Sequence, residues 1–186
     1  MENKILDAIL RRSSIRKFEA TPLTDEQLDA LKKAALASPT ARNAQEQRFV
    51  FVTDRDVIER FDGMLVDIIT AEGNKERTER INSRGRTVLY HPALLVVISG
   101  SPENFYSGID AGIAADNIAL TALSLGLGSV FLGMPRSAFL SDRCEEAMQL
   151  LHMEPDTKFQ LALSVGVPAI QKTPHTWDEA HITEIR

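Results

Sequence analysis

The segment from Arg12 to Arg16 carries the side chains best suited to chemistry in this sequence. It reads Arg-Ser-Ser-Ile-Arg, so two guanidinium groups four residues apart flank two hydroxyls just beyond a helical pattern. Guanidinium groups bind phosphate through two hydrogen bonds, and the hydroxyls can donate further ones. The set suits a phosphate, or the edge of a flavin ring that gains negative charge on reduction. Helix C-termini also favour cations through the helix dipole, so the loop alone leaves both interpretations open.

Two further segments offer groups that could bind a flat polar ligand. Residues 37–45 (ASPTARNAQ) present amides and hydroxyls on a loop that its proline stiffens. Residues 126–135 (GLGSVFLGMP) place backbone N–H groups and apolar side chains at the end of an expected strand. Glycine there would let a flat ligand approach the main chain. Together with the 12–16 loop, these segments predict a binding site for a ligand with both polar and flat parts.

Familiar catalytic signatures are missing from the sequence. Gly126-x-Gly128 follows a helical pattern, and Phe131 stands where a dinucleotide fingerprint needs its third glycine. The sequence has neither a P-loop nor a Gly-x-Ser-x-Gly turn, and its four histidines lack the spacing of a zinc site. We therefore expect no catalytic side chain and no metal. A bound cofactor would then carry out any reaction.

The charge balance and the single cysteine bear on the class and location of the protein. The chain has 21 Lys and Arg against 26 Asp and Glu, a net charge of −5, whereas nucleic-acid binders normally carry a basic surplus. Cys144 stands beside two glutamates, which disfavour a reactive thiolate. One cysteine cannot form an internal disulfide, and the first residues do not resemble a signal peptide. We expect a cytoplasmic protein that does not bind nucleic acid.

Hydrophobic patterning predicts the elements that must hold these segments. The capping box from Thr24 to Gln27 predicts a helix that runs to Leu36. The other expected elements are helices over 3–11, from 55, over 107–125 and over 137–151, and strands at 48–52, 93–98, 129–132 and 159–165. This alternation indicates one α+β domain over residues 1–186, with a mixed central sheet and helices on both faces.

Two stretches need separate interpretation. Residues 117–135 carry no charge, which a hydropathy window would flag as a membrane span. Their polar side chains and two glycines instead favour a helix end followed by a strand, so we expect no membrane segment. Residues 72–86 are rich in charge, which indicates a solvated helix or a mobile lid.

Several segments, taken in order, form a pattern that covers nearly the whole chain. They are Arg12-x-Ser14-x-Arg16-x-Phe18, residues 38–45 (SPTARNAQ), residues 108–117 (GIDAGIAADN) running into 125–128 (LGLG), and residues 163–169 (LSVGVPA). The ordered set resembles the nitroreductase-like family of FMN-dependent oxidoreductases. The sequence departs from the family's pattern at residues 46 and 47, Glu-Gln, where relatives often carry Pro-Trp.

The resemblance implies a three-layer fold and an intertwined homodimer with two FMN sites, each built from both subunits. By position, Arg12 would bind the phosphate and Arg16 would lie near flavin N1/O2. Residues 38–45 would come from the partner subunit, and the backbone N–H of Gly133 would reach flavin N5. His175 stands where an arginine is usual. The implied cofactor-binding residues are Arg12, Ser13, Ser14, Arg16, Ser38, Pro39, Thr40, Asn43, Gln45, Phe131, Leu132, Gly133, Lys172 and His175.

The resemblance also implies an activity. It is the two-electron reduction of nitroaromatics, quinones or similar electron-poor acceptors by NAD(P)H, in a ping-pong mechanism. Residues 63–90 would form a variable lid, and residues 168–186 a C-terminal tail. The same fold also serves flavin reductases, dehalogenases and enone or dehydropeptide oxidases. A carrier or sensor that binds FMN without turnover is a further alternative.

Overall fold

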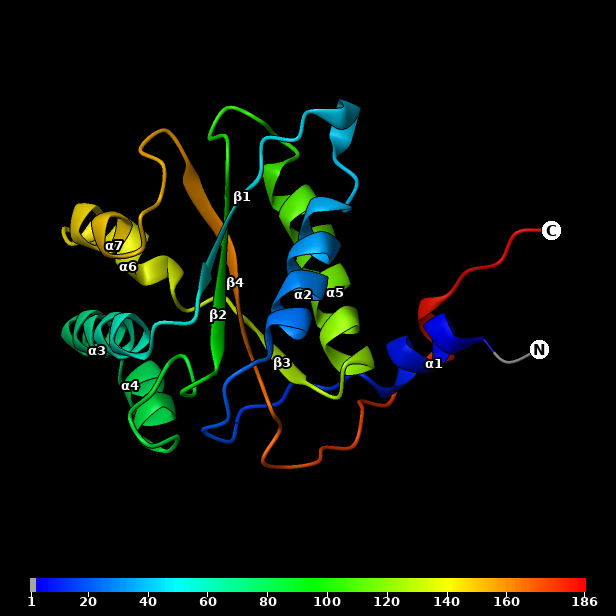
Figure 1. The fold of residues 1–186 in the computed structure, drawn as a ribbon, viewed down its shortest axis with the longest axis horizontal. Coiled ribbons are helices and arrows are strands. Elements are labelled where there is room, and N and C mark those ends of the chain that lie inside the picture. The colour runs from blue at the N-terminus through cyan, green and yellow to red at the C-terminus, as the bar shows by residue number, and fades with distance from the viewer. Residues whose placement is uncertain (1–2) are drawn as a thin grey trace.

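The computed structural model describes residues 3–186, in which four strands form one sheet (Figure 1). The order across the sheet is β1 (Arg48–Val52), β2 (Leu94–Gly100), β4 (Lys158–Gly166) and β3 (Gly128–Leu132), and every neighbouring pair is antiparallel. The expected mixed sheet is therefore wrong. The strands β2 and β3 do run parallel, but β4 lies between them. The described residues contain one parallel pairing outside the strands, an isolated bridge from Ser14 to Ser129.

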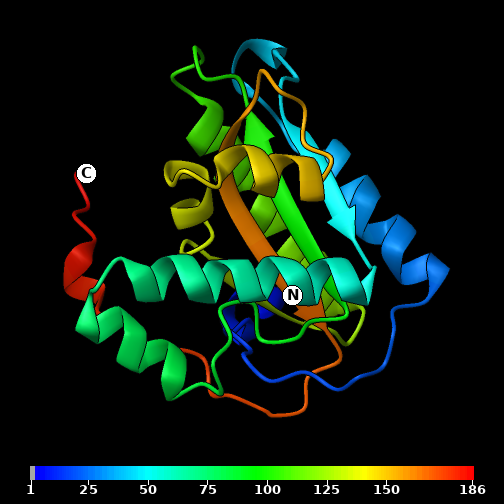
Figure 2. The ribbon, with the colours of Figure 1, turned by 90° about the vertical axis from the view of Figure 1, so that its left-hand side faces the viewer.

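The sheet separates two layers of helices. All seven residues of β2 are buried, and alternate side chains face opposite layers, as strand geometry requires. One face is covered by α2 (Asp25–Leu36) and α5 (Ser107–Ser124). The other is covered by α3 (Arg55–Ala71), α6 (Arg136–Leu140) and α7 (Cys144–Leu150), which Figure 2 shows lying across the sheet. The expected α+β class and helices on both faces are confirmed.

Side-chain caps fix where several helices begin. The side chain of Asn3 accepts a hydrogen bond from the Leu6 amide at 3.1 Å, which starts α1 (Lys4–Arg11). The predicted capping box at Thr24 is present at the start of α2. Asp54 and Asn74 cap α3 and α4 (Lys75–Asn82) in the same way. The caps at Asn3, Thr24 and Asp54 explain why the sequence predicts the starts of these three helices closely.

The expected helix over 137–151 is wrong, because the structure has two short helices there. The first, α6, ends at Leu140, and Ser141 is extended with ψ at 174°. The Oγ atom of Ser141 accepts a hydrogen bond from the Arg143 amide at 3.1 Å, and α7 begins at Cys144. A serine side chain that bonds nearby backbone competes with the helical pattern, and it divides this segment.

The uncharged run divides between a helix and a strand, as the sequence predicts. The helix α5 ends at Ser124, Gly126 has φ at +76°, and β3 starts two residues later. A positive φ favours glycine, so Gly126 allows the chain to turn between α5 and β3. None of the helices in residues 3–186 is both long and apolar enough to cross a membrane.

The segment 63–90 has two distinct parts. Its first residues complete α3 and are buried in the core, including Leu65 and Ile69. The second part, α4 and the turn after it to residue 86, is mostly exposed, although Ile81 is buried. Residues 87–90, which follow it, are buried again. Only the α4 part therefore has the solvated character that the charge pattern predicts.

Candidate functional site

A pocket of about 450 Å³ lies where the loop after α1, the end of α5 and the C-terminal tail meet. Arg12, Ser13, Ser129 and Lys172 are among the residues that line it. The hydroxyl of Ser13 donates a hydrogen bond to the carbonyl oxygen of Lys172 at 3.2 Å, across 159 positions of sequence. The structure therefore brings Arg12 and Ser13, from the start of the chain, together with Lys172 from its C-terminal tail.

Arg12 is the most informative side chain in this pocket. Its guanidinium carbon lies 5.5 Å from the centroid of the Phe131 ring. Its Nη1 atom is buried and has no hydrogen-bond partner among the described residues. Burying an unpaired charged donor is costly, and an anion in the pocket would remove that cost. This orphaned donor, beside a serine hydroxyl and a lysine, fits a phosphate group.

The 12–16 loop is attached directly to β3. The Ile15 amide donates to the Ser129 carbonyl oxygen at 2.9 Å, and Ser14 forms the parallel bridge with Ser129. A Cβ built at Gly128 would lie 2.9 Å from the Cβ of Ile15, so glycine is needed for this close approach. The 12–16 loop, and not a ligand, is therefore what excludes a side chain larger than that of Gly128.

The other residues predicted to bind the same half of the cofactor site differ in their burial and in whether they line this pocket. Arg16 is exposed and lies outside the set that lines the pocket, as does His175. Phe131 is half-buried beneath Arg12, whereas the side chain of Leu132 packs into the core. A Cβ built at Gly133 would meet no described atom within 4 Å, so its backbone faces open space. Leu132 can therefore offer its backbone to a ligand, but not its side chain.

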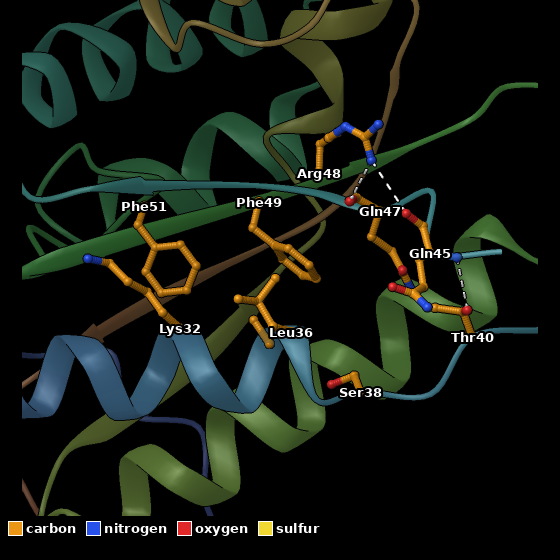
Figure 3. A pocket seen from close by; sticks show the side chains of 10 residues that line it. Lys32, Leu36, Ser38, Thr40, Gln45, Gln47, Arg48, Phe49 and Phe51 are labelled. Carbon is orange, nitrogen blue, oxygen red and sulfur yellow. Dashed lines mark hydrogen bonds between the residues drawn. The ribbon is translucent and has the colours of Figure 1, made fainter. Parts of the chain in front are cut away.

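The 38–45 loop lines a different pocket, of about 530 Å³, between α2, the loop and β1 (Figure 3). Ser38, Thr40 and Gln45 line it together with Phe49 and Phe51 of β1. The Thr40 hydroxyl accepts a hydrogen bond from the Gln45 amide at 3.1 Å. The Gln45 side chain in turn donates to Asn43 Oδ1 at 2.8 Å, whereas Pro39 is exposed beside them.

Two residues on α5 hold this loop, and sequence reasoning did not assign them a role. The carboxylate of Asp110 accepts a hydrogen bond from the Ala41 amide at 3.1 Å. The amide of Asn117 donates to the Ser38 hydroxyl at 2.9 Å. The available signal was their polarity in a helix that is otherwise rich in alanine and isoleucine.

The two groups of predicted residues contact different stretches of α5. Asp110 in the first turn and Asn117 near the middle hold the 38–45 loop, whereas Ala119 and Leu123 line the Arg12 pocket. Thirteen residues separate Asp110 from Leu123, which is about 20 Å along a helix at ~1.5 Å per residue. Within one chain, the structure therefore does not bring the two groups into a single pocket.

A third pocket, of about 680 Å³, lies between α3 and the α6–α7 segment and contains two arginines. Arg77 pairs with Glu72 and donates to Ser137 Oγ at 2.9 Å. Arg143 donates to Glu146 at 2.7 Å, which lowers the pKa of that carboxyl and raises the pKa of the guanidinium. These cations have partners, so this pocket lacks an orphaned cationic donor like Arg12 Nη1. Among residues 3–186, no group of three or more His, Cys, Asp or Glu side chains gathers as a metal site would.

Comparison with known proteins gives consistent relatives. The chain is 30% identical over 175 residues to an NADPH-flavin oxidoreductase of Vibrio harveyi, with 89% of this chain and 66% of that protein covered. It is 27% identical over 181 residues to an FMN reductase (NADPH) of Bacillus subtilis, with 90% and 67% covered. The chain thus spans about two thirds of the length of both relatives.

The fold also matches a solved structure along its whole length. A nitroreductase with bound FMN from Desulfitobacterium hafniense has a TM-score of 0.94, with 28% identity and all of both chains covered. A sequence model described as the nitroreductase family matches residues 9–167, which hold the sheet and every helix that covers it. The chain therefore belongs to the nitroreductase family.

Proposed function

We propose that the chain is an FMN-dependent oxidoreductase that takes electrons from NADH or NADPH. The observation that carries this proposal is the buried Nη1 atom of Arg12, which has no partner among the described residues of a pocket also lined by Ser13 and Lys172. The full-length similarity to a nitroreductase with bound FMN supports the choice of anion. The names of the Vibrio and Bacillus relatives support the electron donor.

The residues of the Arg12 pocket would hold the phosphate end of FMN. Arg12 offers its unpaired N–H group, Ser13 its hydroxyl and Lys172 its ammonium. Ser14 is fixed beside them by its bridge to Ser129. His175 lies three residues beyond Lys172 in the exposed tail and would add to the positive charge. An imidazole carries less charge at neutral pH than the usual arginine, so this contribution would be weaker.

The ring end of FMN would lie along the exit of β3. Phe131 and the backbone of Leu132 offer a wall for the ring, and the Gly133 amide would donate a hydrogen bond to flavin N5. The open space at Gly133 supports this placement. Arg16, exposed on the loop attached to β3, would face the N1/O2 edge. When bound, FMN supplies the hydride and two-electron chemistry that no side chain of this site provides.

The other half of the site would come from a second copy of the chain. Apolar side chains of α1 and α5 are exposed, with Ile5 at 71% and Ile109 at 55% of their full accessible area. In Figure 1, α1 and the end of the tail project away from the sheet, so they are free to contact another molecule. Such an area of exposed apolar surface supports a homodimer. Ser38, Pro39, Thr40, Asn43 and Gln45 of one chain would then meet the FMN held by the other.

The acceptor would be an electron-poor small molecule such as a nitroaromatic or a quinone. The nicotinamide would leave before this acceptor binds at the same open face of the ring, which gives ping-pong kinetics. The single cysteine, Cys144, is not in a disulfide and suits a cytoplasmic location. Flavin reduction is a second candidate activity, since both relatives named above are flavin or FMN reductases.

An absorption spectrum before and after NAD(P)H, recorded without oxygen, tests the proposal. Purified protein should bind FMN and show flavin bands that NAD(P)H bleaches. Protein that stays colourless after FMN is added would overturn it, and bound flavin that NAD(P)H cannot reduce would indicate a carrier or sensor. A screen of NADH and NADPH against nitroaromatics, quinones, free flavin, halogenated aromatics and enones would then identify the acceptor class.

A further inference from the structure

The 38–45 loop has a strained backbone that needs external restraint. Arg42, Asn43 and Gln45 have φ at +56°, +54° and +52°, in the left-handed region that residues other than glycine rarely adopt. Such residues store backbone strain and persist only where the surroundings fix them. The 3₁₀ turn Ala41–Asn43 falls within this segment. The loop would therefore relax if its attachments were removed.

The attachments come from one face of α5. Asp110 and Asn117 are seven residues apart, which is about two helical turns, so both side chains point to the same side. Asp110 is only 4% exposed and accepts the Ala41 amide, and Asn117 donates to Ser38. The Ser38 hydroxyl also donates to the Ala34 carbonyl oxygen at 2.8 Å, which joins the loop to the end of α2. The two side chains thus hold both ends of the 38–41 segment.

A buried carboxylate on a helix rich in alanine does not improve its packing. Burying a charged group is unfavourable unless hydrogen bonds compensate it, and the hydrogen bond recorded for Asp110 goes to the loop. Asn117 is half-buried, and its side-chain amide likewise donates to the loop. The role of these two residues is therefore to fix the loop.

We infer that Asp110 and Asn117 are positioning residues that set the affinity for FMN through the 38–45 loop. The inference rests on the proposed function. In the proposed homodimer, the 38–45 loop of one chain meets the FMN held by the other. Each Asp110–Asn117 pair then acts on the site whose Arg12 belongs to the partner subunit.

The first test compares FMN affinity and stability in matched variants. Asp110→Ala and Asn117→Ala each remove one attachment, and we expect FMN binding to weaken by at least about tenfold, the effect of losing one hydrogen bond to a charged or buried group. Asp110→Asn keeps an acceptor oxygen and should recover most of the affinity. Fluorescence titration of FMN gives the Kd, and the midpoint potential of bound flavin should shift in the same variants.

Asp62→Ala is the matched control for an effect on folding alone. Asp62 is 5% exposed and accepts the amides of Val88 and Leu89 at 2.8 and 2.9 Å, but it lies on α3. The Asp62→Ala substitution should lower the Tm and leave the FMN Kd within twofold of the parent protein's value. If Asp110→Ala changes the Kd no more than Asp62→Ala does, the inference is wrong. If the parent protein binds no FMN, the proposed function fails instead.

A heterodimer tests whether the pair acts across the interface. One subunit carries Asp110→Ala and the other Arg12→Ala, and two affinity tags isolate the mixed species. One site then combines an intact Arg12 with an intact loop, and the other carries both defects. We expect one FMN per heterodimer with the parent's Kd. A heterodimer without a high-affinity site would overturn action across the interface, because each site would then carry one of the two defects within its own chain.

Discussion

At the scale of single residues, the two arginines of the 12–16 loop have different environments although the sequence presents them alike. Arg12 is half-buried against Phe131, and one of its nitrogen atoms is orphaned, whereas Arg16 is exposed. Burial is costly for a cation without a partner, so Arg12 is a preorganised hydrogen-bond donor for an anion. Spacing alone predicts the pair, but it cannot distinguish the two, since burial depends on how the loop attaches to β3.

Replacing Arg12 should separate binding from folding. We expect Arg12→Ala to weaken FMN binding by about 10- to 100-fold, because a hydrogen bond to a charged group stabilises by ~1.5–3 kcal/mol. The free energy of unfolding of the apoprotein should change by less than about 1 kcal/mol, since the lost group has an unpaired atom. Arg11→Ala is the control: Arg11 lines the same pocket but pairs with Asp7 at 3.1 Å. Equal losses of affinity in the two variants would contradict the role given to Arg12.

Replacing Arg16 should affect the redox potential more than the affinity. A cation near N1/O2 stabilises the negative charge of the reduced flavin, so Arg16→Ala should lower the midpoint potential. The expected shift is about 30 mV for each ~1.4 kcal/mol of lost stabilisation in this two-electron couple. A dye-equilibration titration measures it, and Arg16→Lys should restore part of the potential. An unchanged potential would remove Arg16 from this role.

At the scale of elements, the sequence predicts helices and strands well where a local signal exists. Caps at Asn3, Thr24 and Asp54 mark helix starts, and the apolar run of β2 marks a strand buried on both faces. Strand order has no local signal, because β4 enters between β2 and β3 from the far end of the chain. The break at Ser141 depends on one side-chain hydrogen bond, which helical spacing does not reveal.

Gly128 of β3 allows the close packing of the 12–16 loop, so this position affects both the stability of the fold and the site. A methyl group there would lie 2.9 Å from Ile15 Cβ, so Gly128→Ala should push the loop off β3. We expect a loss of ~1–3 kcal/mol in the free energy of unfolding, as for other overpacked positions, together with weaker FMN binding. Chemical denaturation and FMN titration measure the two effects. Gly63→Ala, on α3 with no described atom within 4 Å of the new Cβ, should instead be neutral or stabilising by ~0.5–1 kcal/mol. If Gly128→Ala behaves like Gly63→Ala, the contact is not restrictive.

At the scale of the whole molecule, the exposed apolar side chains are concentrated on α1, α5 and the C-terminal tail. The helix α1 contains no buried residue, and its Ile9 is 50% exposed. In the tail, Trp177 and Ile185 are 65% and 93% exposed. A monomer gains nothing from such surfaces, but a dimer would bury them.

Light scattering after gel filtration should give about twice the 20.6 kDa mass of one chain. Ile9→Glu together with Ile109→Arg places two charges in the apolar surface and should shift the protein to the monomer. The monomer should also lose FMN, since each site would keep only its Arg12 half. Ile58→Val, within the core, serves as a control for stability because it leaves the surface unchanged. A monomeric parent protein, or a monomeric variant that retains FMN, would contradict the shared site.

The division of the site along α5 has a consequence for how the protein holds its cofactor in solution. If one end of the helix supplies the Arg12 pocket and the other end the loop for a partner, subunit association and cofactor retention are thermodynamically linked. Dilution would then release FMN, and added FMN would oppose dissociation by the same factor. The fraction of subunits with bound FMN, measured by flavin absorbance, would therefore depend on the protein concentration.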